Sequence, residues 1–151
     1  MANGLGGVTA KIGRGLVAGA VGTAAMTVSS TIEMKARGRE GSTAPADAAM
    51  KVLGIASFCD DAAKRRFSNA VHWAYGSSWG VPRGLLDAGG LRPAAATAAH
   101  GGALWGFEQV TRPALGVAPP LWRWAVVEVA IDALHHVVYA VATSAAYEAL
   151  G

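Results

Sequence analysis

Asn69-Ala-Val-His72-Trp-Ala-Tyr75-Gly76-Ser-Ser-Trp-Gly80 recurs 64 residues later as Ala133-Leu-His-His136-Val-Val-Tyr139-Ala140-Val-Ala-Thr-Ser144. Both stretches read His-x-x-Tyr-small-x-x-x-small. At 3.6 residues per turn, the histidine, the tyrosine and the second small residue lie close to one stripe of a helix. We therefore predict two apolar helices, each with a narrow polar face, and we interpret them as corresponding members of a duplicated helix pair.

The composition of the whole chain is typical of helices that pack closely in lipid. Charged residues make up 15% of the 151 residues, and four long runs carry no charge at all. We predict an all-α fold in a single membrane domain, residues 1–151. It is a four-helix transmembrane bundle built from the duplicated pair, with spans near 13–34, 65–86, 93–112 and 122–148.

Two connecting or flanking segments have their own patterns. Ser42-Thr43-Ala-Pro45-Ala-Asp47 is typical of a helix start and predicts a short amphipathic helix near 44–56, in the first connection and at the membrane surface. Residues 1–12 are glycine-rich and are expected to be a frayed lead-in. Pro82 is expected to kink or end the second helix. A single cysteine, Cys59, excludes an intramolecular disulfide.

The positions of the basic residues predict the orientation in the membrane. With these spans, nine of the thirteen lysines and arginines fall on the side of the first and third connections. By the positive-inside rule this side is cytoplasmic, so both termini are expected outside a bacterial inner membrane. The basic residues then contact anionic lipid headgroups. Because no patch interleaves arginines with aromatic residues, we expect no nucleic-acid partner.

Glycines spaced four apart predict where helix backbones approach one another. One edge of the first helix carries Gly15, Gly19 and Gly22, and one edge of the second carries Gly76, Gly80 and Gly84. Small residues at this spacing allow close helix packing in lipid. We favour packing within one subunit over a dimer interface.

The fourth helix has the densest polar stripe of the sequence. It comprises Glu128, Asp132, His136, Tyr139 and Thr143, with His135 beside it. Such residues must face the bundle interior or water. Asp132 lies one turn before His136, so its carboxylate is expected to orient the imidazole. Further candidates for the same interior are His72, Tyr75, His100 and Glu108.

Three functions remain open for this stripe. The first is structural: the polar groups satisfy one another, and the protein is an accessory subunit of a membrane complex or a homo-oligomer, with the lipid bilayer and other membrane subunits as its partners. The second is a proton-conducting or small-solute-conducting module that uses Asp132, His136 and His72. The third is a redox protein in which His72 and His136 hold haem b, or Glu128, Asp132, His135 and Glu108 hold a metal. We expect no cofactor, and no catalytic motif indicates an enzyme.

Several of these motifs together resemble the YagU-like family, small bacterial inner-membrane proteins of uncharacterised function. The similarity spans about residues 13–150. It is carried by Gly19-Ala-Val-Gly22-Thr-Ala-Ala-Met26, Thr43-Ala-Pro45, His72-Trp-Ala-Tyr75-Gly76-Ser-Ser-Trp79-Gly80, and His135-His136-Val-Val-Tyr139-Ala140 through Tyr147-Glu148. Pro82-Arg83 departs from the expected glycine- and tyrosine-containing continuation of the second helix. The resemblance implies a four-helix membrane bundle and no catalytic residues.

Overall fold

The computed structural model describes residues 2–151, and every regular element in this part of the chain is helical. The elements are α1 (Ala2–Arg37), α2 (Ala44–Leu53), α3 (Asp61–Ser78), α4 (Gly80–Ala88), α5 (Pro93–Ala114), the 3-10 turn η1 (Leu121–Arg123) and α6 (Val126–Ala149). The all-α prediction is confirmed. Two of these helices, α6 and the Gly6–Arg37 part of α1, are long and apolar enough to cross a membrane.

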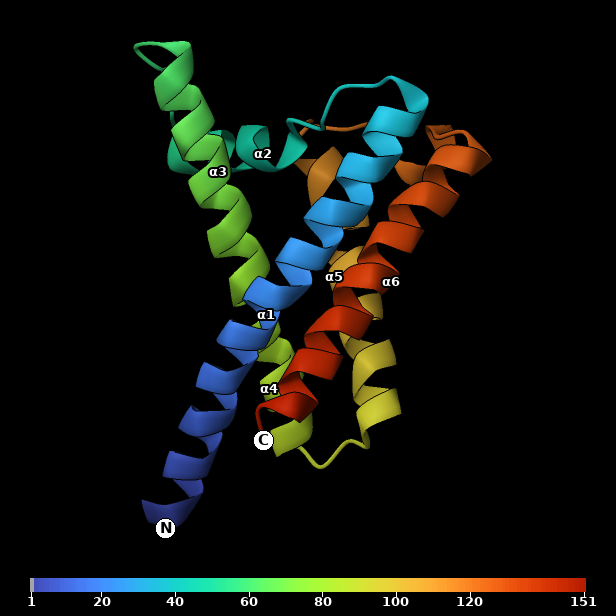
Figure 1. The fold of residues 1–151 in the computed structure, drawn as a ribbon. Helices are drawn as coiled ribbons and strands as arrows, with labels where there is room; N and C mark the ends of the chain where they lie inside the picture. Colours follow the sequence, from blue (N-terminus) through green and yellow to red (C-terminus); the bar gives the residue numbers. More distant parts are fainter. Residues whose placement is uncertain (1) are drawn as a thin grey trace.

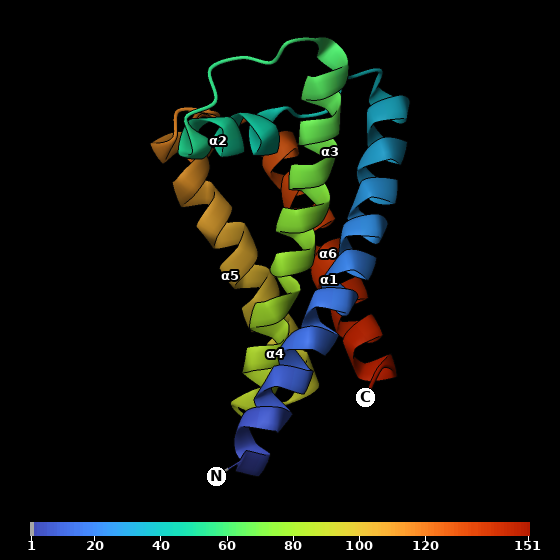
Figure 2. The same ribbon diagram turned by 90° about the vertical axis from the view of Figure 1, so that its left-hand side faces the viewer.

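The long helices run alternately up and down, and α2 lies across one end of them (Figure 1). α1 rises from the N-terminus, α3 and α4 return together, α5 rises and α6 descends to the C-terminus. Both termini therefore lie at the end opposite α2, and we call these the terminal end and the α2 end. Figure 2 shows the same arrangement from the side, with α2 between the upper parts of α3 and α5.

α1 is the central helix and packs against α3, α4 and α6, whereas α5 packs against α4 and α6. α1 begins at Ala2, so the lead-in expected over residues 1–12 is helical instead, in the part of the chain that the structure describes. The N-terminal end of α1 projects beyond the other helices (Figure 1). Continuing the helix satisfies backbone groups that a frayed segment would leave to solvent.

The second predicted span, 65–86, is two helices rather than one. α3 ends at Ser78, α4 begins at Gly80, and Trp79 lies between them. Pro82 lies in the first turn of α4 and has no N–H for the carbonyl of Ser78, and its ring crowds that same carbonyl. The break therefore falls in the turn before the proline, and the helix continues past it to Ala88.

The local signals for the other boundaries are recognisable. Asp60 accepts a hydrogen bond from the backbone N–H of Ala63 (2.6 Å) and caps α3. Gly54 ends α2 with φ at +68°, a conformation that favours glycine. α6 begins at Val126 rather than near 122, because Pro119-Pro120 leads first into η1. α5 starts with Pro93 at its first position.

Close glycine contacts hold α1 against α3, α4 and α6. A Cβ atom on Gly15 or Gly80 would collide with the backbone of the other helix, and one on Gly84 would collide with the carbonyl of Lys11. A Cβ atom on Gly19 would lie 2.5 Å from the carbonyl oxygen of Ser77. Gly22 lies against Thr143, and Gly76 lies against Thr23. The predicted glycines thus lie at close helix contacts within the subunit.

Candidate functional site

A cavity of about 500 Å³ lies between the long helices beneath α2. α1, α3, α5 and α6 all contribute to its wall. Nine residues predicted from the sequence line it, namely His72, Tyr75, Gly76, Glu108, Glu128, Asp132, His135, His136 and Tyr139. The remaining wall is mainly apolar or weakly polar and includes Met26, Thr27, Leu104 and Ile131. Cavities of this size and character are usual for small-molecule sites.

The charged wall of the cavity is built around His136. Its Nε2 lies 3.2 Å from Oε2 of Glu108, and its Nδ1 lies 2.7 Å from the backbone carbonyl oxygen of Asp132. Both neighbours are acceptors, so a doubly protonated imidazolium satisfies both bonds. The carboxylate of Asp132 is farther from Nδ1, at 3.8 Å. His136 Nδ1 therefore donates its hydrogen bond to the backbone carbonyl of Asp132, and the carboxylate of the same residue lies only within ion-pair range.

Asp132 is held by three side chains from α5. Trp105 Nε1 and Gln109 Nε2 donate to its Oδ2 at 2.8 and 3.1 Å, and Arg112 Nη1 donates to Oδ1 at 3.2 Å. Arg112 also pairs with Glu108. One guanidinium and one imidazolium thus face two carboxylates, which compensates the charge of this partly buried group.

Trp105, Gln109 and Arg112 were missed in the sequence analysis. Arg112 was instead counted among the nine basic residues on the predicted cytoplasmic side. A usable signal was its position four residues after Glu108, a spacing that places two opposite charges on one helix face.

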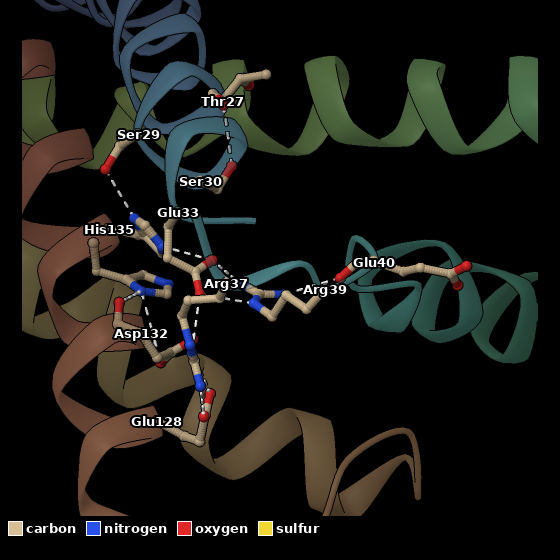
Figure 3. Close-up of polar contacts among 11 residues, drawn as sticks. Thr27, Ser29, Ser30, Glu33, Arg37, Arg39, Glu40, Glu128, Asp132 and His135 are labelled. Carbon is tan, nitrogen blue, oxygen red and sulfur yellow. Dashed lines mark hydrogen bonds and ion pairs between the residues drawn. The ribbon is translucent and has the colours of Figure 1, made fainter. Parts of the chain in front are cut away.

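The other end of the predicted stripe faces α1 instead (Figure 3). His135 Nδ1 bonds Ser29 Oγ at 2.9 Å, and its Nε2 lies 3.8 Å from Glu33 Oε2. Arg37 pairs with Glu33 and with Glu128, whose side chain is 40% exposed. Glu128 is therefore part of an ion-pair network at the rim of the cavity, with Arg39 also bound to Glu33. The predicted single stripe is divided between two faces of α6.

The two copies of the repeated sequence line the cavity from α3 and from α6. On α3, His72 Nε2 bonds Thr27 Oγ1 of α1 at 2.8 Å. On α6, the hydroxyl of Tyr139 donates to the carbonyl oxygen of Gly76 at 2.6 Å. The tyrosine of the second copy, Tyr139, is thus hydrogen-bonded to the small residue of the first copy, Gly76. The helices run in the same direction (Figure 1), as the duplication requires, and the duplication itself stays a prediction.

His100 and Thr143 lie below the cavity rather than in its wall, and both are fully buried. His100 Nε2 donates to the carbonyl oxygen of Trp79 at 2.7 Å. That carbonyl lies at the break between α3 and α4, where the helix ladder is interrupted. His100 thus satisfies a backbone acceptor, and its Nδ1 has no partner.

The structure shows where the residues of the two cofactor alternatives, haem and metal, lie and which partners they bind. His72 and His136 both line the cavity, but each is hydrogen-bonded to a protein side chain, Thr27 and Glu108 respectively. The four residues of the metal alternative bind separate partners, since Glu128 and His135 face α1 whereas Glu108 and Asp132 face Arg112. Among residues 2–151, no three His, Cys, Asp or Glu side chains converge as a metal site.

Comparisons with known proteins give no family assignment. No protein-family model, no curated protein and no solved structure matches this chain.

Proposed function

We propose that this chain is an integral membrane protein with four helical passes, namely α1, α3 with α4, α5 and α6. The support comes from apolar side chains on the outer faces of α1 and α6. On α1, Val17, Val28 and Ile32 are 56, 59 and 64% exposed, and on α6 Leu134 and Val141 are each 56% exposed. Contact of these apolar side chains with water is unfavourable, whereas lipid chains can cover them without this cost.

The lengths and positions of α3 and α5, rather than their hydropathy, support their assignment as membrane passes. α5 has 22 residues, and α3 continues into α4 over a similar length of the bundle. Both helices line the cavity, as α1 and α6 do. Polar groups within a membrane are expected to face an interior of this kind.

The α2 end is proposed to be cytoplasmic, with both termini outside a bacterial inner membrane. Nine of the thirteen lysines and arginines belong to the segments at the α2 end. Arg39 lies there, and the hydrogen bond with Glu33 raises the pKa of its guanidinium above the usual value. Membership of the YagU-like group, proposed from the sequence motifs, agrees with this placement.

Within this framework we propose that the protein binds a small solute in the cavity and acts as a solute-binding or solute-conducting module. One observation carries the proposal: the cavity brings Glu108, His136, Asp132 and Arg112 to a single wall. Charged groups inside a membrane are expensive and usually mark a functional path. A purely structural bundle needs no cavity of about 500 Å³ beside them.

Fluorescence and thermal stability of the purified protein test the binding proposal. Trp79 and Trp124 line the cavity, so a bound solute changes their emission. A library of small amines, amino acids and sugars is screened for a shift in emission and a rise in Tm. His136→Ala should abolish the response, whereas Val137→Ala, the exposed neighbour on the outer face, should leave it intact. An equal response in both variants contradicts the assignment.

Conduction is tested in proteoliposomes with any solute found this way. Asp132→Asn and His136→Ala should each abolish solute flux while circular dichroism shows unchanged helix content. Unchanged flux in these variants rules out transport through this wall of the cavity.

A structural role in a larger membrane assembly is the second candidate. It is favoured by Trp122 and Val126, which are 84 and 86% exposed at the α2 end, where a partner subunit can cover them. Native mass measurement after gentle extraction tests it. A lone monomer contradicts this role, and a stoichiometric partner or a homo-oligomer supports it.

A further inference from the structure

Arg83 is the one fully buried lysine, arginine, aspartate or glutamate among the residues that the structure describes. Its side chain is 0% exposed. It lies on α4, beyond the helix break, where the sequence analysis placed it at the outer membrane surface. A buried guanidinium is costly unless its donors are paired, so its surroundings indicate why it is retained.

The partners of Arg83 connect the deep interior to the terminal end. Its Nε donates to Ser144 Oγ at 3.0 Å, and Nη2 pairs with Glu148, whose side chain is 47% exposed. Its guanidinium also stacks on the ring of Tyr147, 4.5 Å from the centroid. Arg83 therefore spans from a buried hydroxyl to a carboxylate at the solvent-facing end.

Polar groups continue from Ser144 up to the floor of the cavity. Thr97 Oγ1 donates to Ser144 Oγ at 2.8 Å, and His100 lies one turn further along α5. The ring of His100 is 5.7 Å from the ring of Tyr139, which lines the cavity. A series of hydroxyls and one imidazole thus leads from the cavity to Arg83.

Several atoms along this series have no partner. His100 Nδ1, Thr143 Oγ1 and Arg83 Nη1 are buried and unpaired. Buried polar groups of this kind are usually met by water when space allows. Water bound at these atoms would join the hydroxyls and the imidazole into a path for protons, with the cavity as its entrance from the α2 end.

We propose that Arg83 is the charge barrier that keeps this path closed to protons and other cations. The partner carboxylate, Glu148, lies at the solvent-facing side, so on the interior side the positive guanidinium repels a second positive charge in surroundings of low dielectric. Fixed arginines exclude protons from aqueous pores in this way. The barrier lets the cavity bind or conduct a solute without dissipating a proton gradient. This inference rests on the proposed four-pass arrangement.

Proton uptake into proteoliposomes tests the barrier. A potassium gradient with valinomycin sets a negative internal potential, and an internal pH-sensitive dye records proton entry. The wild type should be as proton-tight as empty liposomes. Arg83→Gln removes the charge but keeps a donor for Ser144, and should admit protons on the order of tenfold faster or more. Arg83→Lys keeps a charge and should remain tight.

Arg92→Gln is the matched control, because Arg92 is exposed at the same end and neutralising it should leave the liposomes tight. If Arg83→Gln does not fold, Arg83→Gln combined with Glu148→Gln removes both charges of the pair and should leak in the same way. A tight neutral variant that inserts and folds overturns the barrier, and so does a leaky wild type. Neither result affects solute binding in the cavity, which His136→Ala tests separately. Recovery of the wild type in the soluble fraction overturns the four-pass arrangement and this inference with it.

Discussion

The terminal end and the α2 end of the bundle use different means to hold the same helices. At the terminal end, Gly15 and Gly19 of α1 meet the Gly80 region so closely that backbone touches backbone. At the α2 end the helices separate around a cavity, and charged side chains such as Arg112 and Asp132 bridge them. Close packing excludes ligands, whereas charged bridges across a cavity leave room for one. The terminal end is therefore the rigid part of the bundle, and the α2 end is the part that can bind a ligand.

The largest expected effect is at the glycine contacts. Gly80→Leu places a side chain on the backbone of Gly15 and should destabilise the protein by about 3 kcal/mol or more, because overpacking forces the helices apart. Unfolding in detergent, followed by circular dichroism, measures the loss. Gly102→Leu is the control, since a Cβ atom there meets nothing within 4 Å. Equal losses of stability in the two variants would show that the glycine contacts at the terminal end are no more tightly packed than the rest of the bundle.

A smaller loss is expected at the charged wall. Asp132→Asn replaces a carboxylate that accepts from Trp105, Gln109 and Arg112, and should lower the free energy of unfolding by about 2 kcal/mol. Arg112 keeps Glu108 as a partner, which limits the effect. The same unfolding measurement applies, with Glu128→Gln at the exposed rim as the control. A stability equal to that of the wild type would show that these bonds do not stabilise the packing of α5 against α6.

The smallest expected effect is a pH dependence at the terminal end. Lys11 Nζ lies 2.9 Å from Asp87 Oδ2, and this bond holds the pKa of the Asp87 carboxyl below its ordinary value of 3.8. A lowered folded-state pKa contributes stability that is present above the ordinary value and is lost as the pH falls through the folded-state pKa. Because both side chains are partly exposed, the contribution should stay below about 1 kcal/mol.

Tm measured from pH 6 to pH 3 checks this expectation. The Tm of Asp87→Asn should fall less steeply in the acid range than that of the wild type. Parallel curves for the two proteins would show that the contact with Lys11 contributes nothing at the terminal end.

The helical fold was predictable because its signals are local. Uncharged runs, Pro93 and Pro45 near helix starts and Gly54 after α2 all act through the nearby backbone. Hydropathy predicted less well which helices qualify as spans. Only α6 and the Gly6–Arg37 part of α1 are apolar enough over a long enough window to qualify among the described residues.

The candidate site was predictable only where its residues interrupt an apolar run. His72, Glu108, Asp132 and His136 were found in this way and share the cavity wall. Arg83 and Arg112 were missed because both were counted among the basic residues at the membrane surfaces, where an arginine is usually a headgroup contact. Their burial depends on pairing with α6, which lies far away in the sequence.

The contact between α2 and the connection from α5 to α6 constrains the order of assembly. Lys51 Nζ of α2 donates to the carbonyl oxygen of Leu115 at 2.6 Å, and Leu115 follows α5 in the chain. α2 is synthesised before α5, so this bond can form only after the ribosome has added Leu115. Until then α2 is not bound to the end of α5. The bond that ties α2 to the end of α5 thus forms after the glycine-packed α1 and α4 have been synthesised.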